Sequence, residues 1–382
     1  MRLHLREHLV AMIVSLFLCT ASFAQAGGLL FSLTDLGTFN GTWSEAFAIN
    51  DHGVIVGNMA LSAGGTRCFE YDHGSVTLFQ GGAKPPMCVA LAIDIKGNVA
   101  GATSVSPNTT VYRAFVYEAG KVQMLSMPAG YDYSMALGIR ESTVVGGVGS
   151  TSDSAYCGLP NCSVWYSGLI NAVKWDNNVV TTITTGNHDY GNYARGINNN
   201  GEIVGRLYNW NLTHGTDAPA PWLWKNGVLS YLPMYNDQGW YYGEANAIND
   251  AGVIAGGGGF YNGVVDGICV LEWNSQAPSN LPTAILPCDG SHFINGMALS
   301  LDNWVVGYAD FGYSVAPFLA VPNCGRVSLS TLLDASGAAW DLNSVNGINR
   351  YHQIVGSAIS HQDGQKHAIL LTPNNLPMCP SS

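Results

Sequence analysis

The chain has 382 residues, a formal net charge of −11 at pH 7, and 26 acidic against 15 basic residues. Nucleic-acid binding requires a positively charged surface, so this acidic balance disfavours that class of function. Hydrophobic residues make up 47% of the chain and charged residues 11%, a composition that excludes an intrinsically disordered protein and is typical of an extracytoplasmic β-protein.

The first 26 residues have the pattern of a secretory signal peptide. Arg2 and Arg6 precede a short apolar stretch, and the small residues Ala24 and Ala26 follow it directly. We expect cleavage near Ala26. A membrane anchor is the alternative, but the apolar stretch is short, and no later stretch is long and apolar enough to span a bilayer. We therefore expect a secreted or periplasmic monomer.

A twelve-residue pattern then recurs along the chain. Its first copy, residues 46–57, has an apolar run ending in Ile-Asn, a polar turn ending in Gly, and a second apolar run ending in Gly. Such a pattern predicts two antiparallel strands joined by a tight turn. The further copies are residues 90–101, 136–146, 194–205, 245–256, 296–307 and 345–356.

Each copy is followed by a block that has the pattern of a strand, with an aromatic or aliphatic pair. One more short strand follows most of these blocks. Four strands in each unit of about 50 residues, repeated seven times, predict a seven-bladed β-propeller of four-stranded antiparallel blades. The last unit lacks a fourth strand, which we expect residues 31–37 to supply. Residues 27–373 then form one domain, before a tail at 374–382. A β-solenoid or a pair of sandwiches is the alternative.

The repeats resemble the HAF repeats of secreted bacterial proteins. The likeness lies in residues 46–57, 194–205 and 245–256, and in the segment Asp35, Leu36 and Gly37. Of the family's His-Ala-Phe triad, only the pairs Ala114-Phe115 and His367-Ala368 remain. The resemblance covers roughly residues 31–373. It implies a secreted, propeller-like repeat protein and carries over no catalytic residue.

The two faces of the predicted disc differ in their connections. The inner and outer hairpin turns lie on one face, the short-turn face. The connections between second and third strands, and those between blades, lie on the other, the loop-rich face. Long loops on a rigid scaffold usually carry function. Aromatic and polar side chains together suit the apolar faces and hydroxyls of sugars; the alternative is that they pack the channel and the blade tops. The candidate ligand-binding residues are Trp43, Tyr131, Tyr133, His188, Tyr190, Trp210, Trp240, Tyr241, Asp289, His292 and Trp340.

Eight cysteines follow the leader, and an even number in an exported protein indicates disulfide bonds. The repeat register predicts four pairs: Cys68–Cys88, Cys157–Cys162, Cys269–Cys288 and Cys324–Cys379. We expect Cys68–Cys88 and Cys269–Cys288 to occupy equivalent places in blades one and five. A metal site is the alternative, but no Cys-x-x-Cys pair has the required spacing. We expect neither a metal nor another cofactor.

The sequence has neither a Gly-x-Ser-x-Gly nor a His-Glu-x-x-His motif. The first hypothesis is therefore a non-enzymatic secreted binding module, which recognises a glycan or an extracellular protein partner through its loop-rich face. A propeller enzyme acting on polysaccharide, as a lyase or a glycosidase, is the second. Such an enzyme would place two carboxylates, or a base with a tyrosine, around the channel mouth. A structural or adhesive surface module is the third.

Overall fold

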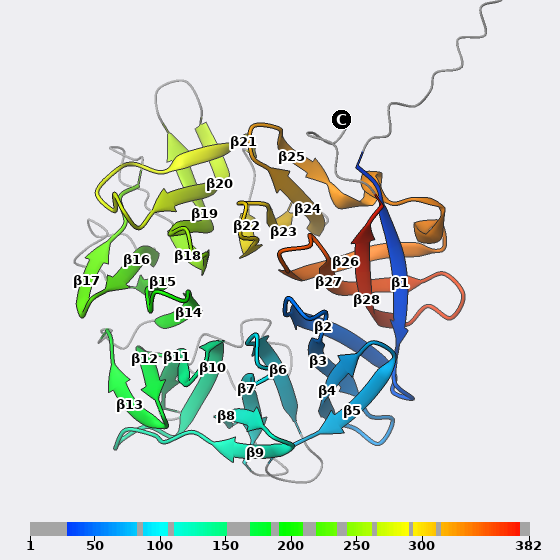
Figure 1. The fold of residues 1–382 in the computed structure, drawn as a ribbon, viewed down its shortest axis with the longest axis horizontal. Coiled ribbons are helices and arrows are strands. Elements are labelled where there is room, and N and C mark those ends of the chain that lie inside the picture. Colours follow the sequence, from blue (N-terminus) through cyan, green and yellow to red (C-terminus); the bar gives the residue numbers. More distant parts are fainter. Residues whose placement is uncertain are drawn as a thin grey trace, which may run out of the picture.

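The computed structural model describes residues 29–81, 87–105, 111–150, 169–184, 191–208, 219–234, 243–261, 266–289, 293–310 and 315–374. In these residues, seven four-stranded antiparallel sheets are arranged as blades around a central axis (Figure 1). The predicted seven-bladed propeller is confirmed. None of the helices in the described ranges is long and apolar enough to cross a membrane.

The blades follow the chain, and within blades one to six the strands run from the axis outwards in sequence order. Blade one consists of β2 (Trp43–Ile49), β3 (Ile55–Ala60), β4 (Thr66–Asp72) and β5 (Ser75–Phe79), and blade two of β6 (Cys88–Ile93), β7 (Val99–Ser104), β8 (Tyr112–Glu118) and β9 (Lys121–Met124). Blade three consists of β10 (Tyr133–Arg140), β11 (Thr143–Gly149), β12 (Asn171–Asp176) and β13 (Val179–Thr182), and blade four of β14 (Tyr193–Ile197), β15 (Ile203–Tyr208), β16 (Pro219–Lys225) and β17 (Val228–Tyr231). Blade five consists of β18 (Gly243–Ile248), β19 (Val253–Tyr261), β20 (Asp266–Asn274) and β21 (Thr283–Asp289), and blade six of β22 (Phe293–Leu299), β23 (Val305–Asp310), β24 (Val315–Val321) and β25 (Gly325–Ser328).

Blade seven closes the ring with strands from both ends of the chain. Its own three strands are β26 (Trp340–Ile348), β27 (Ile354–Ser360) and β28 (Lys366–Pro373), and the 3-10 turns η1 (Leu329–Leu332) and η2 (Ala335–Gly337) precede them. The outermost strand is β1 (Phe31–Gly37), which pairs antiparallel with β28. Figure 1 shows the blue and red ends of the ribbon side by side at this point. The predicted closure by residues 31–37 is confirmed.

The repeated block after each hairpin supplies the core of the blades. Phe69, Phe115, Trp222 and Phe318 occupy the third strands of four blades, and each is at most 1% exposed. The second strand passes over each of these rings at a glycine, because Gly57, Gly101, Gly205 and Gly307 are paired with them. At Gly57, for example, a Cβ atom would lie 2.0 Å from the Glu45 carbonyl oxygen and 2.8 Å from the Phe69 ring. The glycine that ends the repeat therefore permits close packing of the backbone on the aromatic ring.

The asparagine of the Ile-Asn pair links neighbouring blades. Asn50 Oδ1 accepts the backbone N–H groups of His52 and Val54 at 3.0 Å, which holds the hairpin turn. Its Nδ2 donates to the carbonyl oxygen of Asp94 in the next blade, also at 3.0 Å. We call this arrangement the asparagine latch. Four residues form it, between blades one and two, four and five, five and six, and seven and one: Asn50, Asn198, Asn249 and Asn349.

Replacing a latch residue is expected to destabilise the ring measurably. Asn249→Ala leaves the backbone N–H groups of Ala251 and Val253 without their side-chain acceptor, and it removes the side-chain donor of the Ser300 carbonyl oxygen, which keeps only the backbone N–H of Asn303. We expect the free energy of unfolding to fall by about 1–3 kcal/mol, as measured by urea denaturation. His52→Ala, at an exposed position in the turn of blade one, is the control. It should cost at most about 0.5 kcal/mol; equal losses in both variants would contradict the latch.

Two of the predicted disulfides are present. Cys68–Cys88 joins blade one to the first strand of blade two, with a Cα–Cα distance of 5.3 Å. Cys269–Cys288, with a Cα–Cα distance of 4.5 Å, joins β20 to β21. The second pair thus lies within one blade, so the expected equivalence of the two pairs is wrong. The reason is that β21 continues to residue 289 with a shifted register against β20.

The other two predicted pairs involve residues outside the described ranges. Cys324 is disulfide-bonded, whereas Cys379, Cys157 and Cys162 lie in segments that the structure does not describe. Bonds of this kind are typical of oxidising compartments, and they are compatible with an extracytoplasmic protein.

Candidate functional site: the central channel

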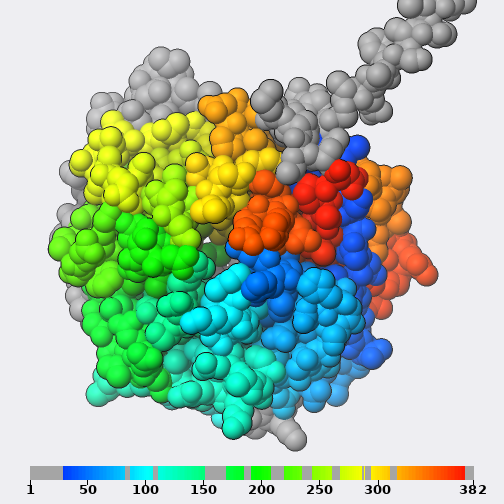
Figure 2. Space-filling view, viewed as in Figure 1, coloured from blue at the N-terminus to red at the C-terminus, as the bar shows by residue number. Residues whose placement is uncertain are grey.

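One residue from each inner strand lines the channel along the axis of the ring. Every inner strand shifts register against its neighbour, as between Ala46 and Ala48 in blade one. The shift leaves one bulged residue outside the pairing. At the equivalent position of the repeat in the seven blades, the residues left out are Phe47, Leu91, Leu137, Arg195, Asn246, Met297 and Asn346; β26 has a second shift, at Asn343. All seven line a single cavity of about 250 Å³, the inner cavity, and Figure 2 shows a hollow at the centre of the disc.

The lining of the inner cavity has an apolar side and a polar side. The first three blades contribute Phe47, Leu91 and Leu137. The polar residues come from the later blades: Arg195 from blade four, Asn246 from blade five and Asn346 from blade seven. An apolar wall facing a few fixed polar groups is the usual composition of a small-ligand site.

The polar side rests on a buried carboxylate. Glu244 is 2% exposed and forms an ion pair with Arg206. Its Oε2 accepts a hydrogen bond of 2.9 Å from Asn295 Nδ2. Burial disfavours the charged form of Glu244, but the charge of Arg206, the hydrogen bond from Asn295 and the charge of Arg195 together hold its pKa below the ordinary value. Glu244 is therefore ionised at neutral pH.

This carboxylate fixes the orientation of a channel amide through one intermediate residue. Because Asn295 donates its Nδ2 to Glu244, its Oδ1 faces Asn246, whose Nδ2 donates to it. Asn246 Nδ2 also donates to the Gly296 carbonyl oxygen, at 3.2 Å. The opposite end, Asn246 Oδ1, is buried and has no hydrogen-bond partner among the described residues. A buried acceptor left without a donor is costly, so this atom is an unsatisfied polar group in the wall of the channel.

A second carboxylate supports the channel between blades seven and one. Glu45 Oε2 lies 2.7 Å from Lys366 Nζ. Its Oε1 accepts from Ser344 Oγ at 2.7 Å and from Asn346 Nδ2 at 3.2 Å. Asn346 also donates to the Ala46 carbonyl oxygen, at 2.9 Å. The amide nitrogen of Asn346 is thus engaged, in contrast to the oxygen of Asn246.

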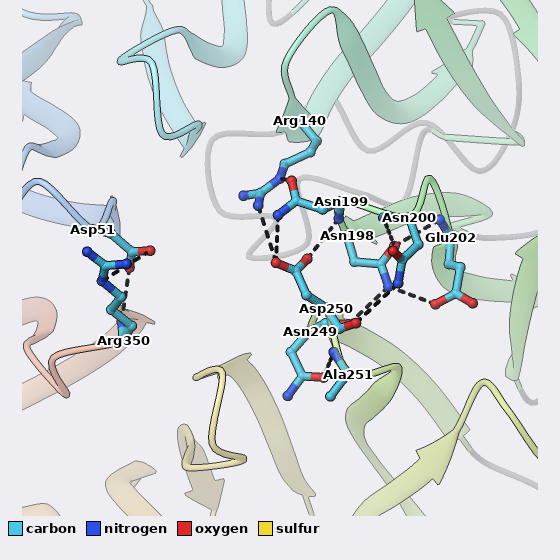
Figure 3. A network of polar contacts seen from close by, with 10 residues as sticks. All are labelled: Asp51, Arg140, Asn198, Asn199, Asn200, Glu202, Asn249, Asp250, Ala251 and Arg350. Atoms are coloured by element: carbon cyan, nitrogen blue, oxygen red, sulfur yellow. Dashed lines mark hydrogen bonds and ion pairs between the residues drawn. The ribbon is translucent and has the colours of Figure 1, made fainter.

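The channel opens on the short-turn face through a second cavity of about 190 Å³, the mouth, which shares Ile49, Ile93 and Ile348 with the inner cavity. Figure 3 shows polar residues around it that turn toward one another. Arg140 interacts with Asp250 at 3.5 Å and with Asn199. These three residues close one part of the rim.

The remaining charges of the rim are balanced. Asp250 accepts from both the backbone nitrogen and the side chain of Asn199, at 2.8 and 2.6 Å. Apart from this cluster, Arg350 lies 3.9 Å from Asp51 (Figure 3). The mouth therefore adds no net charge to the channel.

A larger groove of about 370 Å³ lies between blades two and three. It coincides with a gap in the latch, because Asp94 and Arg140 occupy the positions of the latch asparagine there. Its charged residues Lys96 and Glu141 are 60% and 64% exposed and lie 3.5 Å apart. Such solvated groups bind weakly, so the channel is the better candidate site.

The structure does not gather the predicted ligand-binding residues into one site. Tyr133 is 3% exposed and packs in the core, so its assignment to a ligand-binding surface is wrong. Half-buried Tyr131 accepts a hydrogen bond from Asn171 in the same blade. Trp43 and Trp340 contact consecutive residues of β28: Lys366 Nζ is 4.4 Å from the Trp43 ring centroid, and the His367 ring is 5.2 Å from Trp340.

The other predicted binding residues lie beyond what the structure describes. His188, Tyr190, Trp210, Trp240, Tyr241 and His292 fall outside the described ranges, and only the backbone of Asp289, at the end of β21, is described. The channel residues are not among the binding residues predicted from the sequence. The signal that could have found them is the variable position inside the repeat, between a preceding small or β-branched residue and a following Ala or Gly.

No metal-binding cluster of three or more His, Cys, Asp or Glu side chains is found in the described part of the chain. No family model matches the sequence, and no curated protein matches it significantly. The relationships that can be stated are therefore those of fold.

Several solved structures are similar. One is the β-propeller domain of the Trilobed protease from Pyrococcus furiosus, with 10% identity, a TM-score of 0.51, and coverage of 92% of this chain and 97% of that one. Another is a prolyl endopeptidase with 11% identity and a TM-score of 0.53, covering 91% of this chain and 51% of that one. The Aleuria aurantia lectin in complex with Fucalpha1-6GlcNAc has 12% identity and a TM-score of 0.37, covering 75% of this chain and 94% of that one.

Identities this low show the fold alone, and the TM-score of the lectin is too low to support an argument. The fold and the channel together define the class of this protein: a seven-bladed β-propeller with a lined axial cavity.

Proposed function

We propose that this protein is a secreted, non-enzymatic binding module, which recognises a glycan or an extracellular protein partner through its loop-rich face. The observation that carries the proposal is the unequal distribution of connections in a rigid ring. Inner hairpin turns are as short as residues 50–54 and 141–142, whereas the connection between the second and third strands of blade three is residues 150–170. Long loops on a fixed scaffold are the usual place for recognition.

Three further observations support the proposal. Trp43 and Trp340 lie at the strand ends that meet the loop-rich face, and both are half-buried. The disulfides fit an extracytoplasmic compartment, as does the leader pattern of residues 1–26. The likeness of the repeats to HAF repeats, which we propose reflects membership of that family, points to the same compartment.

A glycan and polysaccharide binding screen of the purified protein, with release of soluble products followed in parallel, tests the proposal. Binding without product release is expected. Release of oligosaccharides or unsaturated products would overturn it in favour of an enzyme. If no glycan binds in the screen, the glycan hypothesis is excluded, and an extracellular protein remains as the proposed partner.

Trp240→Ala is expected to weaken binding of any retained glycan by tenfold or more, because an aromatic ring that stacks on a ligand usually contributes strongly. The melting temperature should stay unchanged. Tyr231→Ala, at a 43% exposed position on the outer strand β17, is the matched control and should bind as the unmodified protein does. A lower melting temperature for the Trp240 variant would assign that residue to the core instead.

A further inference from the structure

We propose that the groove between blades two and three is a binding site for a short polypeptide segment in which a basic residue stands next to an aliphatic one. The groove opens on the short-turn face, since the inner hairpin turns of both blades and the outer hairpin turn of blade three line it. The site goes beyond the proposed function, because it does not involve the loop-rich face. Its partner is a protein that exposes such a segment.

The groove exists because the asparagine latch is absent at this junction. Asp94 occupies the latch position in blade two, and its carboxylate accepts the backbone N–H groups of Lys96 and Asn98 at 2.9 and 2.8 Å. A carboxylate has no N–H group, so it cannot donate to the next blade as the latch asparagine does. Blade three also turns with only two residues, 141–142, where blade two uses residues 94–98. The space left between the two blades measures about 370 Å³, and ligand pockets usually measure about 300–1,000 Å³.

The junction of blades four and five shows what fills the equivalent space elsewhere in the ring. Lys225 ends the third strand of blade four, at the position that Glu118 has in blade two. Its Nζ crosses to blade five, where it donates to the Ser275 carbonyl oxygen at 3.1 Å, and it lies 2.8 Å from the carboxylate of Glu202. The side chain of Glu118, in contrast, forms no hydrogen bond or ion pair with any described residue. The groove thus has an unpaired carboxylate where the other junction has a lysine of the protein itself.

The charges of the rim select a basic residue. Glu118 and Glu141 line the groove with Lys96 as the one described cation, and Lys96 pairs with Glu141 at 3.5 Å. Lys121 stands opposite Glu118 in the outer hairpin but does not line the groove. The exposed Lys96–Glu141 pair contributes little by itself, so Glu118 leaves the rim with one negative charge to be paired. The formal net charge of −11 also favours association with a basic partner.

The floor of the groove accepts the aliphatic residue. It consists of Val116, Leu125, Ile139 and Val144, which belong to the apolar core shared by blades two and three. None of the described residues that line the groove is aromatic, so it lacks the platform on which a sugar ring would stack. Gln123 stands at the rim, where its amide suits the N–H and C=O groups of a polypeptide backbone. Burial of the aliphatic side chain supplies most of the affinity, and Glu118 sets the specificity.

Peptide binding to the full chain tests the site. The probe is a fluorescent peptide Gly-Ser-Ile-Lys-Ser-Gly, blocked at both termini. The first control peptide has Gln in place of Lys and is expected to bind at least threefold more weakly, because it cannot form the charge-assisted bond to Glu118. The second has Gly in place of Ile and is expected to bind at least fivefold more weakly, because it buries no aliphatic side chain.

Two variants locate the binding. Glu118→Gln is expected to weaken the Lys peptide at least threefold, to leave the Gln peptide unchanged, and so to abolish the preference between them. Ser142→Phe fills the groove from an exposed turn position without removing a charge. It is expected to weaken both peptides at least fivefold at an unchanged melting temperature. Asp72→Asn removes an equal charge at the same position of the repeat in blade one, and is expected to bind as the unmodified protein does.

Several outcomes would overturn the site. Equal binding of the Lys and Gln peptides to the unmodified protein would remove the role of Glu118, and equal binding of the Ile and Gly peptides would remove that of the floor. Binding unaffected by both groove variants would place the peptide elsewhere, and no binding at millimolar peptide would exclude the site altogether. The glycan screen and the Trp240 variant address the loop-rich face, so either proposal can fail alone.

Discussion

Deletion of residues 29–37 is expected to lower the free energy of unfolding by more than about 5 kcal/mol, so that the ring no longer closes stably. The deleted segment contains β1, the outermost strand of blade seven. Phe31 is fully buried in it and Leu33 is 7% exposed, and loss of one buried Phe side chain alone typically costs about 3–5 kcal/mol. The deletion also leaves the edge of β28 unpaired.

Urea denaturation followed by circular dichroism measures this effect. Thr34→Ala changes an exposed position on the same strand, and it should alter the free energy of unfolding by no more than about 0.5 kcal/mol. Phe31→Ala should reproduce a large part of the deletion. An unchanged unfolding midpoint after deletion would show that blade seven is stable with three strands, and would contradict closure by β1 as the stabilising contact.

Arg206→Met is expected to lower the free energy of unfolding by about 3–5 kcal/mol at neutral pH, because it leaves Glu244 ionised and buried without its main cation. Removing both charges costs less than removing one, since no uncompensated charge remains. We therefore expect Arg206→Met combined with Glu244→Gln to recover part of the loss. Arg350→Met, which breaks the exposed 3.9 Å pair with Asp51, should leave the free energy of unfolding nearly unchanged.

The pH dependence of the stability of Arg206→Met shows whether lost charge pairing or lost packing destabilises this variant. In the unmodified protein the pKa of Glu244 is lowered from 4.5, so its ionised form contributes stability above that value, and this contribution is lost as the pH falls through the lowered pKa. In Arg206→Met, burial dominates and is expected to raise the pKa of Glu244. The loss in free energy of unfolding caused by Arg206→Met should therefore be smaller at pH 4 than at neutral pH. If this loss stays the same at every pH, lost packing around Arg206 would be its cause, and the unpaired charge of Glu244 would not.

The repeat in the sequence predicted the architecture well. A hairpin with a fixed turn and a fixed glycine recurs seven times, and each copy must bury the same faces, so the number of blades follows from the number of copies. The closing strand follows from the same count, because one blade lacks a strand and residues 31–37 have the missing pattern. Cys68–Cys88 was predictable for the same reason.

The candidate site was less predictable. Tyr133 was expected on the loop-rich face, in a connection between blades, yet the packing of neighbouring blades buries it. The channel residues were missed because each is a single variable position within a repeat. Only the bulge in each inner strand turns all seven toward the axis.

The sequence alone thus determined the hairpin, the blade, the number of blades and the ring closure, because local strand and turn preferences repeat and every copy packs against the next. The tertiary structure decided what the ring contains. Arg206, Glu244 and Asn295 belong to three different blades, and only closure of the ring brings their charges and amides together around the acceptor of Asn246. Contacts between positions about 50 residues apart follow from the geometry of the whole circle, which no single repeat encodes.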